Sequence, residues 1–246
     1  MASTGTRRSL DLNFPIEVAL GNVGGVTALR KYGMNDVVGT GTYDMWPLAS
    51  VMVWPSVAAT ISVVSSSAND AAAGTGARTI MINGLDSSYA EISETVTMNG
   101  ATPVVTVAQF LRVNSVFAVT AGSGGVNAGN ITGTLSGNTI FYVEATQGAA
   151  HQMQYTVPAG KTLLVLNTRY GTGRFQSSGD CHILAQVRPL GGAWRSLQDI
   201  YLYQNIYQPS VVGGESIPEK TDIRALVVST INTQAFGEFA GWLITN

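Results

Sequence analysis

The sequence predicts an all-β protein with two antiparallel β-sandwich domains of jelly-roll-like type, preceded by an extended glycine-rich N-terminal arm. Three observations lead to this prediction. Short runs of alternating residues recur from Trp46 onward, turn residues separate them, and no window has the period of a long helix. With 246 residues, the chain has room for two sandwiches of ordinary size. We expect the arm over residues 1–50, the first sandwich over 51–147 and the second over 148–246.

The arm is predicted from the density of glycine in the first 50 residues. Gly21, Gly24 and Gly25 follow one another closely, and Gly33 and Gly39 come soon after. Glycine at this density disfavours a regular helix and favours extended or looped chain. We interpret the segment as an arm that packs along the domains or reaches a neighbouring subunit. The alternative is a first edge strand of the first domain, with loops.

The first domain is expected to consist of short strands with turns between them. Glycine, serine and asparagine clusters mark the turns, as in antiparallel sandwiches and barrels. The expected strands are Ser50–Trp54, Ile61–Val64, two runs within Gly74–Gly100, Val104–Val107, Phe110–Thr120, Asn130–Leu135 and Thr139–Ala145.

The stretch Gly74–Gly100 predicts a β-hairpin. If its loop spans Asn83–Tyr89, Arg78 faces Glu94 across the ladder and their charges set the register. Asn99-Gly100 has the residues of a two-residue type I′ turn and would close the next hairpin. We interpret the stretch as scaffold, with no feature of an active site.

The second domain repeats the strand pattern after a short connector, Gln147–Ala150. A proline-glycine turn and a pair of glycines separate its runs, and the last run ends the chain on apolar residues. The expected strands are His151–Val157, Lys161–Tyr170, Cys181–Arg188, Trp194–Tyr203, Ile223–Thr230 and Phe236–Ile244.

Composition argues against several functional classes. Only 11% of residues are charged, against roughly 25% in a typical soluble domain, and the formal net charge is -2. Such a chain has no basic field for nucleic acid and no polybasic patch for a membrane. The first residues carry charges and lack an apolar core segment, so we expect no secretory signal. With one cysteine, Cys181, there is no internal disulfide framework.

No residue pattern indicates catalysis, a cofactor or a metal ion. Gly160-Lys161-Thr162 lacks the first glycine of a phosphate-binding loop and precedes a strand. Cys181 and His182 are neighbours on a strand, so their side chains point to opposite faces. The residues that best suit a glycan or protein contact are Trp194, Tyr201 and Tyr207, because aromatic rings beside polar groups suit such surfaces. Packing of some of these rings into the core is the alternative.

Four segments carry a resemblance to known proteins: GTGARTIMINGLDSSYAEISETVTMNGATPVVT, FLRVN, AGSGGVNAGNIT and YTVPAGKTLLV. They resemble segments of bacteriophage virion proteins, a group that includes capsid decoration (cement) proteins and head or tail fibre proteins. The resemblance covers roughly residues 60–166 and, more faintly, the IPEKTDIRALV segment to the C-terminus, and it brings no catalytic residues. The N-terminal arm and the Trp194–Tyr207 region lie outside it.

The resemblance implies a non-enzymatic structural protein on the surface of a phage particle, made in the host bacterial cytoplasm. We expect a capsid decoration protein, trimeric, that bridges capsomers and contacts the major capsid protein and other virion proteins. The alternative is a head or tail fibre or receptor-binding protein that contacts host glycan. A third possibility is a polysaccharide-degrading enzyme, for which the sequence offers no site.

Overall fold

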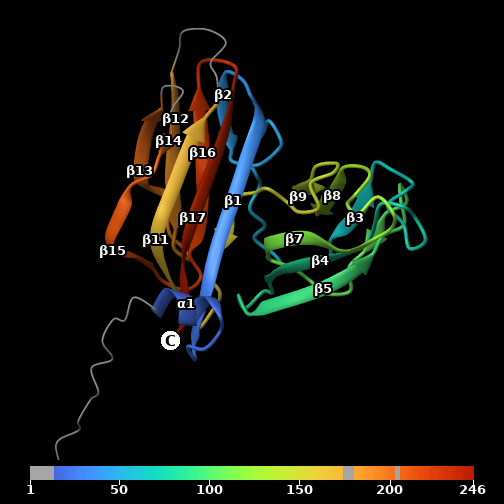
Figure 1. Cartoon of the computed structure of the whole chain (residues 1–246), viewed down its shortest axis with the longest axis horizontal. Helices are drawn as coiled ribbons and strands as arrows, with labels where there is room; N and C mark the ends of the chain where they lie inside the picture. Colours follow the sequence, from blue (N-terminus) through green and yellow to red (C-terminus); the bar gives the residue numbers. More distant parts are fainter. Residues whose placement is uncertain (1–13, 174–179, 203–205) are drawn as a thin grey trace, which may run out of the picture.

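The protein forms two lobes of antiparallel β-sheet (Figure 1). The computed structural model describes residues 14–173, 180–202 and 206–246. Nearly all of its regular structure is strand, apart from the short helix α1 (Phe14–Ala19), which confirms the predicted all-β class. The large lobe contains β1, β2 and β10 to β17. The small lobe contains β3 to β9.

Two sheets make up the large lobe. The β17 sheet has the order β1-β17-β11, with β14 and β15 both on the far side of β11. The β16 sheet has the order β16-β12-β13, with β2 and β10 both on the far side of β16. Their strands are β1 (Val26–Val38), β2 (Gly41–Asp44), β10 (Tyr155–Thr156), β11 (Lys161–Thr172), β12 (Cys181–Arg188), β13 (Arg195–Leu202), β14 (Ile206–Tyr207), β15 (Ser210–Ile217), β16 (Asp222–Ser229) and β17 (Thr233–Thr245).

The pairing in the large lobe is nested. In chain order its eight main strands are β1, β2, β11, β12, β13, β15, β16 and β17. The innermost pair is β12 with β13, followed outward by β11 with β15, β2 with β16, and β1 with β17. One sheet therefore contains strands one, eight, three and six of this series, and the other contains two, seven, four and five.

The prediction of an arm over residues 1–50 is wrong from residue 26 onward. β1 is an edge strand, as in the alternative reading, but it belongs to the sheet of the C-terminal strand rather than to the first domain. Its glycine-rich sequence is compatible with this because Gly33 lies where a Cβ atom would meet the Met45 carbonyl oxygen at 2.5 Å. Residues 1–13 lie outside the described part of the chain.

The small lobe is inserted between β2 and β11 and has two sheets. One has the order β6-β3-β8-β9 and the other β5-β4-β7. A boundary at residue 147 stays a prediction, although the buried cluster of the small lobe draws on residues 61–143. The strands are β3 (Ser62–Ser65), β4 (Ala77–Leu85), β5 (Glu91–Thr97), β6 (Val104–Val105), β7 (Arg112–Ala121), β8 (Ile131–Leu135) and β9 (Asn138–Val143).

The predicted hairpin exists, but its register is wrong. Ile82 faces Glu94, and the Met98 N–H donates to the Arg78 carbonyl oxygen at 2.9 Å. The loop is shorter than expected because the Asp86 carboxylate accepts the N–H groups of Ser88 and Ala90 and closes a tight turn.

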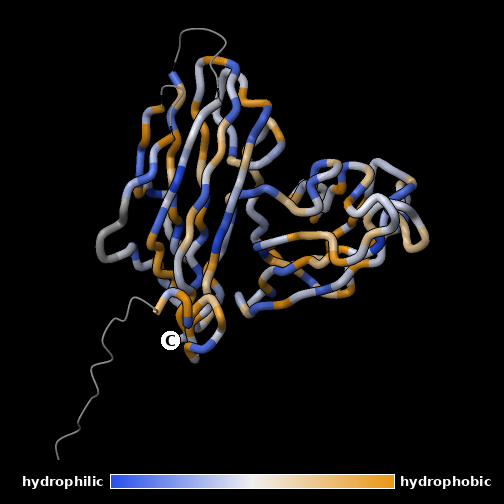
Figure 2. Tube along the Cα trace, in the orientation of Figure 1, coloured by the Kyte–Doolittle hydropathy of each residue, from blue (hydrophilic) through white to orange (hydrophobic). Residues whose placement is uncertain are grey.

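The shift in register leaves every side chain of both strands on its expected face of the sheet. Each residue meets a partner four positions from the expected one, an even number, so the alternating side chains stay on their faces. The buried residues are therefore the expected ones: Ile80, Ile82, Val96 and Met98. Hydrophobic and hydrophilic residues interchange along the strands of both lobes (Figure 2).

Arg78 and Glu94 do not pair. Arg78 Nε donates to the Gly74 carbonyl oxygen at 3.0 Å, while the Glu94 carboxylate accepts the N–H groups of Val107 and Ala108. The predicted hairpin after Asn99-Gly100 is also absent, because β5 and β6 lie in different sheets.

Asp70 holds the loops of the small lobe together. Its fully buried carboxylate accepts the N–H groups of Ala77 and Ala128 at 2.7 Å each and of Gly129 at 2.9 Å. The Ser65 hydroxyl donates to it at 2.6 Å. One side chain thus satisfies four donors on three segments of the chain.

We expect Asp70→Asn to lower the free energy of unfolding by about 2–3 kcal/mol, since the amide nitrogen cannot accept a hydrogen bond and leaves buried donors unpaired. Urea denaturation measures the change. Asp36→Asn, at an exposed position, is the control and should change stability by less than about 0.5 kcal/mol. Equal effects of both substitutions would contradict this role.

Candidate functional site

The junction of the two lobes is built around one buried carboxylate. Asp222, at the start of β16, binds Arg112 of the small lobe through two contacts, Nε–Oδ1 at 2.8 Å and Nη2–Oδ2 at 3.1 Å. Arg188 of β12 donates to Oδ2 at 2.6 Å, and the Thr156 hydroxyl donates to Oδ1 at 2.7 Å. The side chains of Asp222 and Arg112 are only 5% and 7% exposed, so the charges compensate one another away from water.

Two tryptophans cover this ionic cluster. Trp54 comes from the segment that leads into the small lobe, and its ring lies 5.4 Å from the Arg112 guanidinium carbon. Trp194 lies 4.6 Å from that of Arg188 and 4.0 Å from that of Arg224, and meets Trp54 edge-on at 5.3 Å. These distances are those of cation–π contacts. Trp194 thus packs at the junction.

A second set of contacts links the lobes beside the ionic cluster. The Asn114 amide of β7 donates to the Thr156 carbonyl oxygen and accepts its N–H, both at 2.9 Å, as a neighbouring strand would. Lys31 of β1 is buried, and its Nζ donates to the Asn114 carbonyl oxygen at 2.5 Å. Burial lowers the Lys31 pKa from 10.5 to about 7.

The predicted contact residues do not share one surface. Tyr201 is exposed on β13 and packs on His182 across the ladder, with ring centroids 4.7 Å apart. Tyr207 is exposed on β14, opposite Tyr170 of β11 in the other sheet. Trp194 is half-buried. Their role in glycan binding stays a prediction.

The described side chains offer little reactive chemistry. Cys181 is buried in the core of the large lobe, and burial raises the pKa of its thiol to about 11. His182, the next residue, lies on the opposite face, with Nδ1 3.4 Å from Asp199 Oδ1. Within residues 14–173, 180–202 and 206–246 no three His, Cys, Asp or Glu side chains are grouped to hold a metal ion. No helix in these ranges is long and apolar enough to span a membrane.

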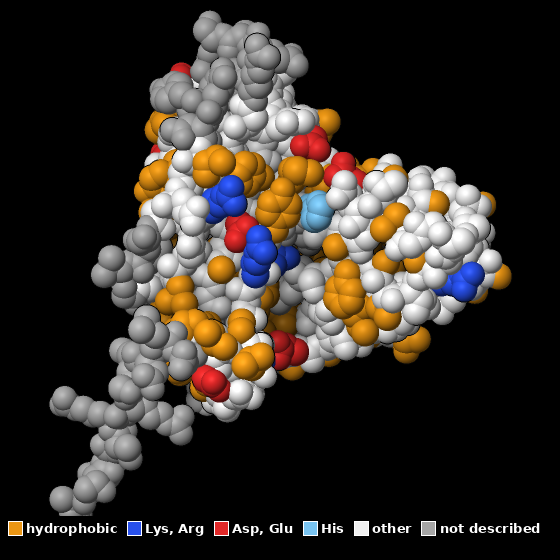
Figure 3. Space-filling view, viewed as in Figure 1, with side chains coloured by type: hydrophobic (Ala, Val, Ile, Leu, Met, Phe, Trp, Pro, Cys, Tyr) orange, Lys and Arg blue, Asp and Glu red, His pale blue; other side chains and the backbone are white. Residues whose placement is uncertain are grey.

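The outward face of the β17 sheet has apolar residues on both sides of a charged group. An antiparallel sheet that faces water normally alternates to polar residues on that side. Here Glu238 of β17 binds Arg30 of β1 at 2.8 Å and lies opposite Arg169 of β11. Beside this group, Trp242 is half-buried and packs on Phe14 of α1 with centroids 4.9 Å apart. Figure 3 shows hydrophobic side chains over this sheet, with positively and negatively charged side chains between them. The apolar residues of the face include Met34, Leu164, Phe236, Ala240, Trp242 and Ile244.

The signal for this face was present in the sequence. Phe236, Ala240, Trp242 and Ile244 alternate with the core residues Ala235, Phe239 and Leu243, so both faces of β17 carry apolar residues, with Glu238 among those on the outward face.

We expect Asp222→Ala to lower the free energy of unfolding by about 3–5 kcal/mol, because it leaves buried guanidinium groups without their carboxylate. Calorimetry should then resolve separate transitions for the two lobes. Glu238→Ala, which removes an ion pair with the 70% exposed Arg30, is the control and should cost less than about 1 kcal/mol. A single unchanged transition in Asp222→Ala would show that the lobes do not depend on this carboxylate.

Lys31 predicts a pH dependence of stability. Between pH 7 and 10.5 the unfolded chain holds a proton on this lysine that the folded protein does not, so stability rises with pH. We therefore expect the unfolding free energy of the wild type, minus that of Lys31→Met, to increase with pH in this window by up to about 1.4 kcal/mol per pH unit. Below pH 7 the difference should be constant. Urea denaturation from pH 6 to 9.5 measures it, and a flat difference would disprove it.

Comparison with known proteins gives no family. No protein-family model matches the chain, and neither does any curated protein. Among solved structures, the chain is similar to the VP2 subviral particle of infectious bursal disease virus, with 10% identity over 89% of this chain and 72% of that chain and a TM-score of 0.26. The Gt strain of that virus gives 11% identity, 94% and 78% coverage and a TM-score of 0.25. TM-scores this low do not establish a shared fold.

Proposed function

We propose that this chain is a non-enzymatic structural protein of a virus particle and, more finely, a decoration (cement) protein on the head of a bacteriophage. The nested strand order of the large lobe carries the proposal. Pairing of the first strand with the eighth, the second with the seventh, the third with the sixth and the fourth with the fifth is the order of a jelly roll. Jelly rolls recur in viral capsid and lectin domains.

The insertion of the small lobe supports the same role. It leaves the large lobe after β2 and returns before β10, and the buried contacts of Asp222 and Asn114 fix its orientation. A lobe held in this way can reach a neighbouring subunit at a defined angle. We propose that the large lobe contacts the particle and that the small lobe bridges to the next capsomer.

Surface composition supports permanent assembly. Only 11% of residues are charged, and the outward face of the β17 sheet carries half-buried apolar residues. The partners we propose are the major capsid protein, other virion proteins and two further copies of this chain in a trimer. The location is the particle surface, reached after synthesis in the bacterial cytoplasm, and nucleic acid, membranes and cofactors have no part in the proposal.

A receptor-binding fibre protein is the second candidate. The exposed Tyr201 and Tyr207 favour it, since lectins also use jelly rolls. The two rings lie in different sheets, and Trp194 is engaged by arginines, so one glycan would not meet all three. Binding of the chain to a glycan array, if Tyr201→Ala abolished it, would favour this second candidate over our proposal.

Reconstitution tests the proposal. We expect the purified chain to be a trimer by light scattering and to bind expanded capsids of its own virus that lack it, but not unexpanded ones. Ala240→Arg should weaken binding at least tenfold, because it adds a second positive charge opposite Arg30 in the proposed contact face. Leu190→Arg, in an exposed turn elsewhere on the large lobe, should not. Labelling confined to the tail, or no binding to capsids, would disprove the decoration role. Closed shells formed by the chain alone would make it a shell subunit instead.

A further inference from the structure

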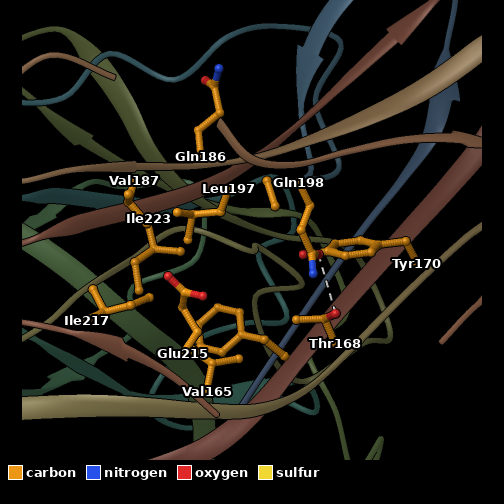
Figure 4. A pocket seen from close by; sticks show the side chains of 12 residues that line it. Val165, Thr168, Tyr170, Gln186, Val187, Leu197, Gln198, Glu215, Ile217 and Ile223 are labelled. Atoms are coloured by element: carbon orange, nitrogen blue, oxygen red, sulfur yellow. Dashed lines mark hydrogen bonds between the residues drawn. The ribbon is translucent and has the colours of Figure 1, made fainter. Parts of the chain in front are cut away.

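A cavity of about 90 Å³ lies between the two sheets of the large lobe (Figure 4). A single water needs only about 10–15 Å³, so the cavity has room for a small molecule. Two exposed residues, Leu197 of β13 and Glu215 of β15, lie on its lining and mark its mouth. None of the contacts at the lobe junction involves this cavity.

Both sheets are irregular beside the cavity. In β11 the pairing with β17 shifts between Val165 and Asn167, so Leu166 is an extra residue, and the pairing with β15 is irregular at the same place. In the facing sheet the pairing of β12 with β13 shifts between Ala185 and Gln186, so Leu197 is extra. A β-bulge bends its strand, and bulges are frequent next to functional sites. Two bulges on facing sheets at one cavity indicate a formed opening rather than a chance packing defect.

The lining has an apolar body and one acidic group. The side chains of Val187, Ile217, Ile223 and Phe239 form the apolar wall. The two uncharged polar groups of the inner end, Thr168 and Gln198, face one another with a hydroxyl–carbonyl distance of 3.4 Å.

The acidic group is Glu215. Figure 4 shows its carboxylate directed toward the ring of apolar side chains. Within the described part of the chain, no ion-pair or hydrogen-bond partner of this carboxylate is found. A ligand that fits must therefore be small and apolar with one cationic end.

We propose that this cavity binds a small alkylammonium-type molecule, with its apolar body between the sheets and its cationic end at Glu215. The proposal does not depend on the role in a virus particle. Binding would hold the two sheets together at the position where both ladders are interrupted. The thermal midpoint of the protein would then rise with ligand concentration.

The probes are n-butylamine, n-butanol and butyrate, titrated into the full chain and followed by NMR. We expect n-butylamine to bind roughly three- to fivefold more tightly than n-butanol, as for a partly exposed charge pair, and butyrate to bind most weakly. Glu215→Gln should bring n-butylamine to the affinity of n-butanol. Equal affinities of the three probes, or an unchanged preference in Glu215→Gln, would overturn the proposal.

A bulky substitution at the mouth of the cavity provides the second test. Leu197→Trp should abolish binding of n-butylamine, and Leu190→Trp, at an exposed position that does not line the cavity, should leave it unchanged. Binding that survives Leu197→Trp would place the amine elsewhere and overturn the proposal. If Leu197→Trp does not fold, a crystal of the wild type under xenon decides: xenon in the cavity supports an apolar site, and its absence there contradicts it.

Discussion

The constraint on which the fold depends is the placement of the last strand, β17, in the middle of a sheet. It pairs along most of its length with β1, near the start of the chain, and with β11. Gly241 allows this close pairing, because a Cβ atom there would meet the Leu164 carbonyl oxygen at 2.1 Å. The β17 sheet is therefore incomplete until β17 has been made, and the small lobe must be accommodated between β1 and β17. Loop-closure entropy of this size favours slow folding and a small lobe that folds as a unit of its own.

The contacts at the junction determine the orientation of the small lobe relative to the large lobe. A buried ion pair is weak evidence for stability, since desolvation of Asp222 and Arg112 offsets much of their attraction. Its geometry is specific, however, because Arg112 reaches across with a two-point contact and Asn114 matches the backbone of Thr156. A misplaced small lobe would leave these buried groups unpaired, which costs far more than a lost apolar contact. We therefore regard the junction as a device that selects one orientation of the lobes.

The sequence predicted the strands better than their partners, for a physical reason. Alternation reports which face of a strand is buried, so Ile80 and Ile82 were assigned correctly even though the register was off by an even number. The alternation contains no information about which strand pairs with which. In the nested order β1 pairs with residues some 200 positions away in the sequence. The local turn could have been found, because Asp86 followed by serines is a recognised turn former. The role of Trp194 could not, since its arginine partners become neighbours only in the folded sheet.

Several of the sparse charges of this chain have structural roles. Arg112, Arg188 and Arg224 all lie at the junction, and the carboxylates of Asp70 and Asp222 are buried. With only 11% charged residues and a formal net charge of -2, long-range electrostatic steering contributes little to its associations. Contacts made through such a surface must rely on buried area and shape, and their strength should depend only weakly on salt. Apolar residues such as Phe236, Trp242 and Ile244 on the outward face of a sheet are therefore better explained by a permanent neighbour than by transient encounters.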